Sequence, residues 1–259
     1  MVFPVSDDNS DRTLFPIVTI ALIVINVFVF VVLQGMGEND NFTLAYCQVP
    51  AEILSGRDVV TEPTMREVAV QGQQVVVAVP GLRPTPIPVW LTLLTGIFMP
   101  GSIMHLLGNM WFLWLFGDNV EDCMGHLRYT FFYLACGILA SLAFVATNAT
   151  GEASLTPCLG ASGAISGVLG AYLVLHPHRR VSVIIMRMMV DVPGSMAVGI
   201  WFLFQVVSGL FDTGGGGGGV AYSAHVAGFL AGMVLAKPMS ANWARAEADP
   251  LVILRRRIG

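Results

Sequence analysis

Charged residues are scarce in this chain: lysine, arginine, aspartate and glutamate make up 12% of its 259 residues, whereas hydrophobic residues make up 55%. A soluble domain has about 25% charged residues, and at this length its surface needs more charge than the chain supplies. Disorder is excluded too, because disordered chains are rich in charge and poor in apolar residues. The net charge of −4 is small and scattered, which argues against nucleic-acid binding. The composition therefore predicts a membrane protein with several spans.

Metal-ligand spacing and a signal peptide are also missing. The four cysteines, at positions 47, 123, 136 and 158, do not have the spacing of a zinc site. Cys47 and Cys158 fall on the same predicted side of the membrane, which leaves a disulfide between them open. The first apolar run has no basic segment before it and no cleavage site after it. We therefore expect that run to be a retained span.

Six apolar segments are interpreted as membrane spans. They lie at residues 14–34, 103–117, 129–147, 161–176, 196–212 and 221–236. Residues 38–88 form a long soluble-looking loop, with room for a strand or an amphipathic piece but too little core for a domain. The apolar residues 181–190 carry Arg187 in their middle, and we interpret them as a loop piece at the membrane interface.

The basic residues orient these spans. With the N-terminus inside, ten lysines and arginines fall on inner segments and three on outer segments, as the positive-inside rule requires. The predicted fold class is thus an all-α polytopic membrane protein, a six-transmembrane-helix bundle with both termini cytoplasmic. Its predicted parts are a cytoplasmic N-terminus (1–13), a membrane core (14–237) with a long outer loop at about 36–102, and a cytoplasmic tail (238–259). The absence of an evident repeat disfavours an inverted-repeat transporter.

Four polar residues stand out inside the spans, where such side chains are costly: His105, Asn109, Ser162 and His225. Measured from the cytoplasmic end of its own helix at about 1.5 Å per residue, Ser162 lies about 21 Å up, His105 about 20 Å and His225 about 18 Å. Asn109 is one turn from His105 on the same helix face. Polar side chains from three helices thus fall at nearly one depth, about 10 Å below the outer surface of a core about 30 Å thick.

These residue types suit nucleophilic catalysis. A serine hydroxyl is a poor nucleophile until a nearby base takes its proton, and histidine is the usual base. Ser162 begins a predicted helix, so backbone N–H groups point toward a developing oxyanion, and His105 and Asn109 would add side-chain donors. The fourth span is too short to cross the bilayer, so its start must be surrounded by protein or by a water-filled cavity.

Structural interpretations of the same residues stay open. Small residues at four-residue spacing in the fourth and sixth spans are also how membrane helices pack. Ser166, one turn from Ser162, is either a packing hydroxyl or the true nucleophile. Asn109 alone would suit a hydrogen bond between helices, and a lone intramembrane histidine is more often structural or a proton relay. The joint occurrence at one depth favours catalysis.

Three motifs carry a resemblance to a known family. They are HLLGNMW at 105–111 followed by FGDNVE at 116–121, GASGAISG at 160–167, and AHVAGFLAG at 224–232. Through them the chain resembles the rhomboid intramembrane serine proteases over roughly residues 14–34 and 89–237. The resemblance implies a Ser162–His225 catalytic dyad without a third acid. It also implies oxyanion stabilisation by the Ser162 backbone N–H, His105 and Asn109.

The same resemblance implies the partners. Substrates would be single-span membrane proteins that enter from the bilayer and are cut near its outer face, and no metal or cofactor is expected. We expect a multi-pass protein of a bacterial inner membrane. The chain departs from the family pattern at Ser166, where some members carry an aromatic residue that packs on the dyad histidine, and at Asp122, where relatives often carry arginine.

Two other functions remain as alternatives. A non-catalytic member of the family would bind transmembrane clients, but such members usually lack the serine or the histidine. A small channel or proton-coupled transporter would use His105 and His225 and be indifferent to Ser162. The glycine run at residues 214–219 predicts either a mobile cap or a plain spacer, and the basic residues 255–257 predict either lipid contact or an orientation signal.

Overall fold

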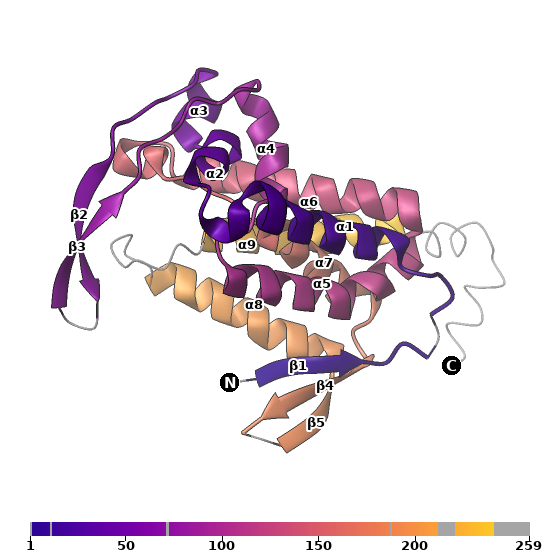
Figure 1. Ribbon diagram of the computed structural model, residues 1–259. Helices are drawn as coiled ribbons and strands as arrows, with labels where there is room; N and C mark the ends of the chain where they lie inside the picture. Colours follow the sequence, from indigo (N-terminus) through magenta and orange to yellow (C-terminus); the bar gives the residue numbers. More distant parts are fainter. Residues whose placement is uncertain (1, 11, 71–72, 187, 212–220, 241–259) are drawn as a thin grey trace.

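The computed structural model describes residues 2–10, 12–70, 73–186, 188–211 and 221–240 (Figure 1). The glycine run at 214–219 and the basic residues 255–257 lie outside this part of the chain. The helices are α1 (Ile17–Phe28), α2 (Asp40–Tyr46), α3 (Pro50–Ser55), α4 (Thr92–Thr95), α5 (Ile103–Met124), α6 (His126–Thr147), α7 (Ser162–Leu175), α8 (Gly194–Phe211) and α9 (Tyr222–Met239). The strands are β1 (Val2–Asp7), β2 (Thr64–Val70), β3 (Gln73–Val79), β4 (Arg180–Ile185) and β5 (Met188–Pro193).

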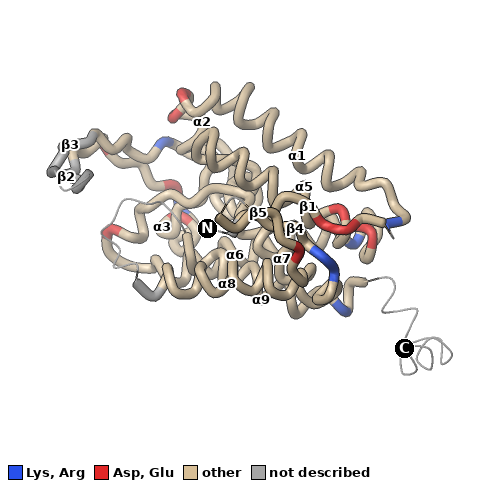
Figure 2. The backbone as a smooth tube through the Cα atoms, turned by 90° about the horizontal axis from the view of Figure 1, so that it is seen from below, with Lys and Arg blue, Asp and Glu red and all other residues tan. Residues whose placement is uncertain are grey.

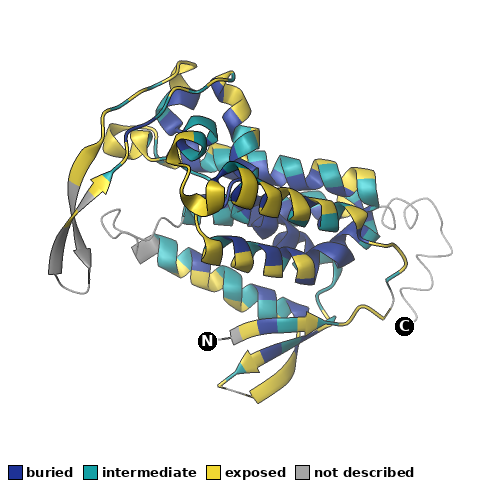
Figure 3. Ribbon diagram, in the orientation of Figure 1, coloured by how far each residue is buried: buried dark blue, intermediate teal, exposed yellow. Residues whose placement is uncertain are grey.

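Helix α7 lies at the centre of the bundle and packs against α5, α6, α8 and α9. Its residues from Gly163 to Tyr172 are all buried. Figure 3 shows that α1, α5 and α8 instead turn much of their surface outward. Large apolar side chains are exposed on these helices, among them Val24, Trp114 and Phe204. An apolar surface of this extent fits a protein surrounded by lipid.

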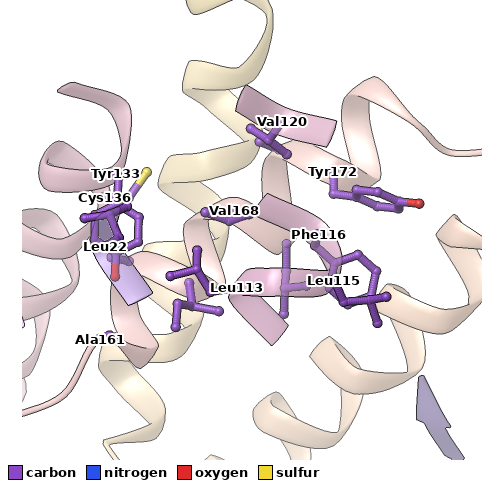
Figure 4. Packing of buried hydrophobic residues seen from close by; sticks show 14 of the residues in the cluster. Leu22, Leu113, Leu115, Phe116, Val120, Tyr133, Cys136, Ala161, Val168 and Tyr172 are labelled. Atoms are coloured by element: carbon purple, nitrogen blue, oxygen red, sulfur yellow. The ribbon is translucent and has the colours of Figure 1, made fainter. Parts of the chain in front are cut away.

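The main core lies among α1, α5, α6 and α7 (Figure 4). Leu113 and Val168 are fully buried there. The rings of Phe116 and Tyr172 meet edge to face, with 4.8 Å between their centroids, a favourable geometry for an aromatic pair. This contact holds α7, which begins at Ser162, against α5, which carries His105.

Local signals set the two ends of α5. The Ser102 hydroxyl accepts a hydrogen bond from the backbone N–H of His105 at 3.1 Å, which satisfies one of the orphan donors at the helix start. Gly125, at φ 77°, ends the helix and leads directly into α6. A positive φ of this size favours glycine. The start of α5 is therefore fixed next to His105.

Span lengths agree only in part with the six predicted crossings. Within the described residues, His126–Thr147 is long and apolar enough to cross a bilayer alone, and Val89–Phe98 with Ile103–Met124 passes the same test as a pair bent by 77°. The apolar helices Ile17–Leu33, Ser162–Leu175 and Gly194–Gly209 are shorter. The chain is mostly helical, as predicted, but the count of six spans and the side of the termini stay predictions.

The sequence predicted no folded sheet beside the helix bundle, and this was wrong. Strands β1, β4 and β5 form an antiparallel sheet in the order β1-β4-β5, so residues 181–185 and 188–190 belong to paired strands and not to an interfacial loop piece. The β-branched residues of β4 favour a strand. Its partner β1 lies far away in the sequence, in the segment read as a plain cytoplasmic N-terminus. Trp111 of α5 donates to the Pro4 carbonyl at 2.9 Å and docks β1 on the bundle.

The outer loop is more ordered than the sequence indicated. Strands β2 and β3 form an antiparallel hairpin within residues 38–88, where the sequence allowed a strand or an amphipathic piece. Helices α2 and α3 add a small second core, whose buried residues are Leu44, Cys47, Val49, Leu82 and Met99. Cys47 and Cys158 are free thiols, so the disulfide left open by the sequence is not formed.

Charged residues lie mainly at the ends of the helices and in the loops (Figure 2). One of them, Glu121 near the end of α5, is fully buried. Its carboxylate accepts hydrogen bonds from the backbone N–H groups of Val18 and Thr19 at 2.9 and 2.8 Å, and lies 2.6 Å from His126 Nδ1. An acidic side chain at a helix start satisfies orphan N–H groups and the helix dipole together. Glu121 therefore anchors the start of α1.

We expect Glu121→Ala to lower the free energy of unfolding by about 2–4 kcal/mol, because buried N–H groups lose a charged acceptor. The thermal midpoint in detergent would fall by about 5–10 °C. Glu38→Ala is the matched control, since Glu38 is an exposed carboxylate in the segment between α1 and α2. Equal midpoints for the two variants would contradict the anchoring role.

Candidate active site

Ser162 and His225 meet at the interface between α7 and α9. The Nε2 atom of His225 lies 2.7 Å from the Ser162 hydroxyl oxygen, a hydrogen-bond distance. Ser162 is the first residue of α7, and His225 lies in the first turn of α9. This is the contact between nucleophile and base that serine catalysis requires.

Glycines bring the two helices into backbone contact. A Cβ atom on Gly228 would lie 2.1 Å from the Gly163 carbonyl oxygen, and one on Gly232 would lie 1.9 Å from the Gly167 carbonyl oxygen. Both distances are far inside van der Waals contact, so any side chain there would push α9 away from α7. The small-residue pattern does serve packing, and this packing places His225 beside Ser162.

His105 borders the same space from α5. A Cβ atom on Gly160 would lie 3.0 Å from His105 Nε2 and 3.7 Å from the Ser162 hydroxyl oxygen. The backbone N–H of Gly101 donates to His105 Nδ1 at 3.3 Å. A neutral ring that accepts at Nδ1 carries its proton on Nε2. The nitrogen near Gly160 is therefore the donor.

The outer loop holds the segment just before Ser162. Backbone groups of Gln48 and Cys158 exchange two hydrogen bonds, at 2.8 and 3.1 Å, and the Gly160 N–H donates to the Gly96 carbonyl at 2.8 Å. Gly160 has φ 127°, a conformation that favours glycine. The chain thus reaches Ser162 on a path fixed by hydrogen bonds to the loop at about 36–102.

Asn109 lies one turn beyond His105 on α5. Its side-chain Nδ2 atom is buried and finds no acceptor among the described residues. Leaving a buried N–H without a partner costs about 1–3 kcal/mol, and such a group calls for an explanation, such as a role in the chemistry of a site. An incoming oxygen with negative charge would satisfy it.

Ser166 does not share the geometry of Ser162. It is buried, and its hydroxyl donates to the Ser162 carbonyl oxygen at 2.6 Å. This bond to the preceding turn is a common way for a serine to be satisfied inside a helix. The structure therefore favours the packing interpretation of Ser166.

Two residues of α8 complete the surroundings of His225, and the sequence did not single them out. The Nδ1 atom of His225 lies 2.8 Å from Gln205 Oε1. One turn earlier, the ring of Trp201 packs near the His225 ring, with centroids 6.3 Å apart. Trp201 thus supplies from α8 an aromatic contact that Ser166 cannot make from α7. The signal for Gln205 was available, because an amide inside an apolar span is itself unusual.

Among the described residues, no group of three or more His, Cys, Asp or Glu side chains is placed to hold a metal ion. The chemistry that the site offers comes from a serine hydroxyl, an imidazole that touches it, and N–H donors around the same small space. These are the groups that acyl transfer through a serine nucleophile requires.

Sequence similarity to known proteins identifies the family of the chain. Residues 88–242 match the family model described as the Rhomboid domain. The chain belongs to the rhomboid family. Its match covers α5 to α9 and therefore both Ser162 and His225.

Individual relatives of this rhomboid are distant. "Presenilin-associated rhomboid-like protein, mitochondrial" of Homo sapiens is 32% identical over 104 residues, which are 40% of this chain and 27% of that protein. "Rhomboid protease GluP" of Bacillus subtilis is 29% identical over 170 residues, 66% of this chain and 31% of that protein. "Rhomboid protein 1, mitochondrial" of Saccharomyces cerevisiae is 28% identical over 148 residues, 56% of this chain and 40% of that protein. The matches thus span less than half of each relative.

Family membership makes this rhomboid an integral membrane protein. The bacterial inner membrane expected from the sequence finds no support in the comparisons, because two of these three relatives are named as mitochondrial.

Proposed function

We propose that this rhomboid is an intramembrane serine endopeptidase in which Ser162 is the nucleophile and His225 the general base. The observation that carries the proposal is the 2.7 Å contact between His225 Nε2 and the Ser162 hydroxyl oxygen. A client-binding protein has no need of such a contact, whereas a serine hydrolase does. The family match and the name of the Bacillus subtilis protease give independent support.

The proposed reaction proceeds in two halves. His225 Nε2 takes the Ser162 proton while the oxygen attacks the carbonyl carbon of the scissile peptide bond. The tetrahedral intermediate then collapses, and the imidazolium returns the proton to the leaving amine. A water molecule, activated by the same imidazole, attacks the acyl-enzyme and releases the second fragment with Ser162 restored. No third acid is required, because a neutral imidazole suffices as the base.

The negative oxygen of the intermediate would be held by three donors. They are the backbone N–H of Ser162, the Nε2–H of His105 and the free side-chain amide of Asn109. The first turn of α7 offers N–H groups that have no acceptor inside the helix. Donors fixed in advance around a developing charge are a large source of catalytic power.

The proposed substrates are single-span membrane proteins, cut near the outer face of the bilayer. The support for this class is the position of Ser162, one third of the way into the predicted membrane core, at the start of a helix too short to cross it. In this arrangement both termini are cytoplasmic and the loop carrying β2 and β3 is on the outer side.

Asn109→Ala should lower kcat for cleavage by about 10²-fold, as loss of one oxyanion donor does elsewhere, with little change in KM. Asn26→Ala is the matched control, because Asn26 is a buried amide on α1 whose donor bonds its own helix at Leu22. Cleavage kinetics in liposomes measure both variants. An oxyanion role would be contradicted if Asn109→Ala raised KM and left kcat unchanged. It would also be contradicted if Asn26→Ala lowered kcat as much as Asn109→Ala does.

Cleavage of a labelled single-span protein, reconstituted with the purified chain in liposomes, tests the function itself. We expect two fragments whose masses locate the cut near the outer face. If the substrate binds but stays intact, the chain is a client-binding member of the family. Ion flux that is indifferent to Ser162 would instead favour the channel.

A further inference from the structure

We infer that Gln205 is a positioning residue for His225 and acts as a neutral third member of the catalytic group. This inference rests on the proposed function and extends it. The contact joins His225 Nδ1 to Gln205 Oε1 at 2.8 Å, on the side of the imidazole ring opposite the Ser162 hydroxyl. The family resemblance implied a dyad without a third acid, and glutamine is not an acid.

The chemistry of the contact determines the tautomer. An amide oxygen can only accept a hydrogen bond, so His225 Nδ1 must carry the proton and donate it. Nε2 is then left with a lone pair facing the Ser162 O–H, which is the form a general base needs. Without the acceptor, the opposite tautomer would place an N–H against the serine and disable the base.

Burial makes the contact specific. Gln205 is 7% exposed and comes from α8, a helix that contributes neither the nucleophile nor the base. Trp201, one turn earlier on α8, packs near the ring of His225. Ring orientation is thus set from one helix by two contacts: Trp201 near the ring and Gln205 at its edge.

Gln205→Leu should lower kcat about tenfold, which corresponds to one hydrogen bond, and leave KM nearly unchanged. Gln205→Glu keeps an acceptor and should recover most of kcat. Because its carboxylate stabilises the imidazolium, the acidic limb of the kcat/KM profile should move up by about one pH unit. His105 of α5 is a second titratable group close to His225, so both profiles are also recorded in the His105→Ala background. Ser208→Ala removes a hydroxyl nearly one turn further along α8 and is the matched control.

A second measurement does not depend on activity. Spectra of the protein labelled with ¹⁵N-histidine report which ring nitrogen is protonated, and the His225 signals are those missing from His225→Ala. We expect the Nδ1–H tautomer in the parent and a mixture in Gln205→Leu.

The two measurements separate the failure of this inference from failure of the proposed function. If Ser162-dependent cleavage is observed while Gln205→Leu keeps the parent's kcat, pH profile and tautomer, the inference is wrong and the protease stands. If no cleavage depends on Ser162, the proposed function is wrong, and an unchanged tautomer in Gln205→Leu would overturn the positioning contact as well.

Discussion

Ser162→Ala is expected to lower the rate of substrate cleavage by about 10⁴-fold or more. The hydroxyl that forms the acyl-enzyme is removed, and single losses of a serine or its base in other serine hydrolases cost about as much as losing the whole group. His225→Ala should have an equal effect, because without the base the Ser162 proton has no acceptor. Turnover of a single-span substrate in liposomes measures both variants.

Matched controls keep this prediction specific to the site. Ser166→Ala removes a hydroxyl one turn away that bonds the Ser162 carbonyl, and it should change turnover by less than about threefold. His178→Ala removes an exposed histidine after the end of α7 and should leave turnover unchanged. If Ser166→Ala abolishes cleavage while Ser162→Ala does not, the nucleophile has been assigned to the wrong serine.

Gly232→Ala is expected to impair both the stability and the activity of the protein. The added Cβ would lie 1.9 Å from the Gly167 carbonyl oxygen, so α9 must move away from α7 by more than 1 Å. Overpacking of this kind costs about 1–3 kcal/mol. A displacement of about 1 Å at reacting groups costs about 10²-fold in rate. Thermal unfolding in detergent and turnover per folded molecule measure the two effects separately.

Gly199→Ala in α8 is the matched control. A Cβ at this position meets no atom within 4 Å among the described residues, so the substitution should leave turnover unchanged. It should stabilise the helix by up to about 1 kcal/mol, since alanine favours helix over glycine. A Gly232→Ala protein with the parent's thermal midpoint and turnover would contradict the role of the glycine contact between α7 and α9.

The candidate site could be located from the sequence because polar residues are conspicuous in apolar spans. Ser162, His105 and His225 were measured from three different helix ends and fell at one depth, and the structure brings them around one small space. Gln205 is also an amide inside an apolar span, but nothing in its own span indicates which residue it contacts. Its partner is an imidazole nitrogen 20 residues further along the chain, and a sequence without an alignment does not reveal such a pair.

The strands show which pairings local sequence patterns predict and which they do not. Strands β2 and β3 are neighbours in the sequence, and the sequence allowed a strand or an amphipathic piece within residues 38–88. The sheet of β1, β4 and β5 was missed because Phe3 pairs with Ile184, a partner that no local pattern connects to it. The bundle sets this pairing, because β1 docks on α5 through Trp111 and β4 follows α7 in the chain. Helical periodicity and span length carry no information about it.

Covalent labelling with a fluorophosphonate probe shows whether Ser162 is a nucleophile activated by His225. The folded protein in detergent is treated with the probe, and the modified residue is located by peptide mass spectrometry. We expect one adduct, on Ser162, that is lost in His225→Ala and retained in Ser166→Ala. A folded protein that takes no probe at Ser162, or takes it equally well without His225, would contradict a serine nucleophile activated by this histidine.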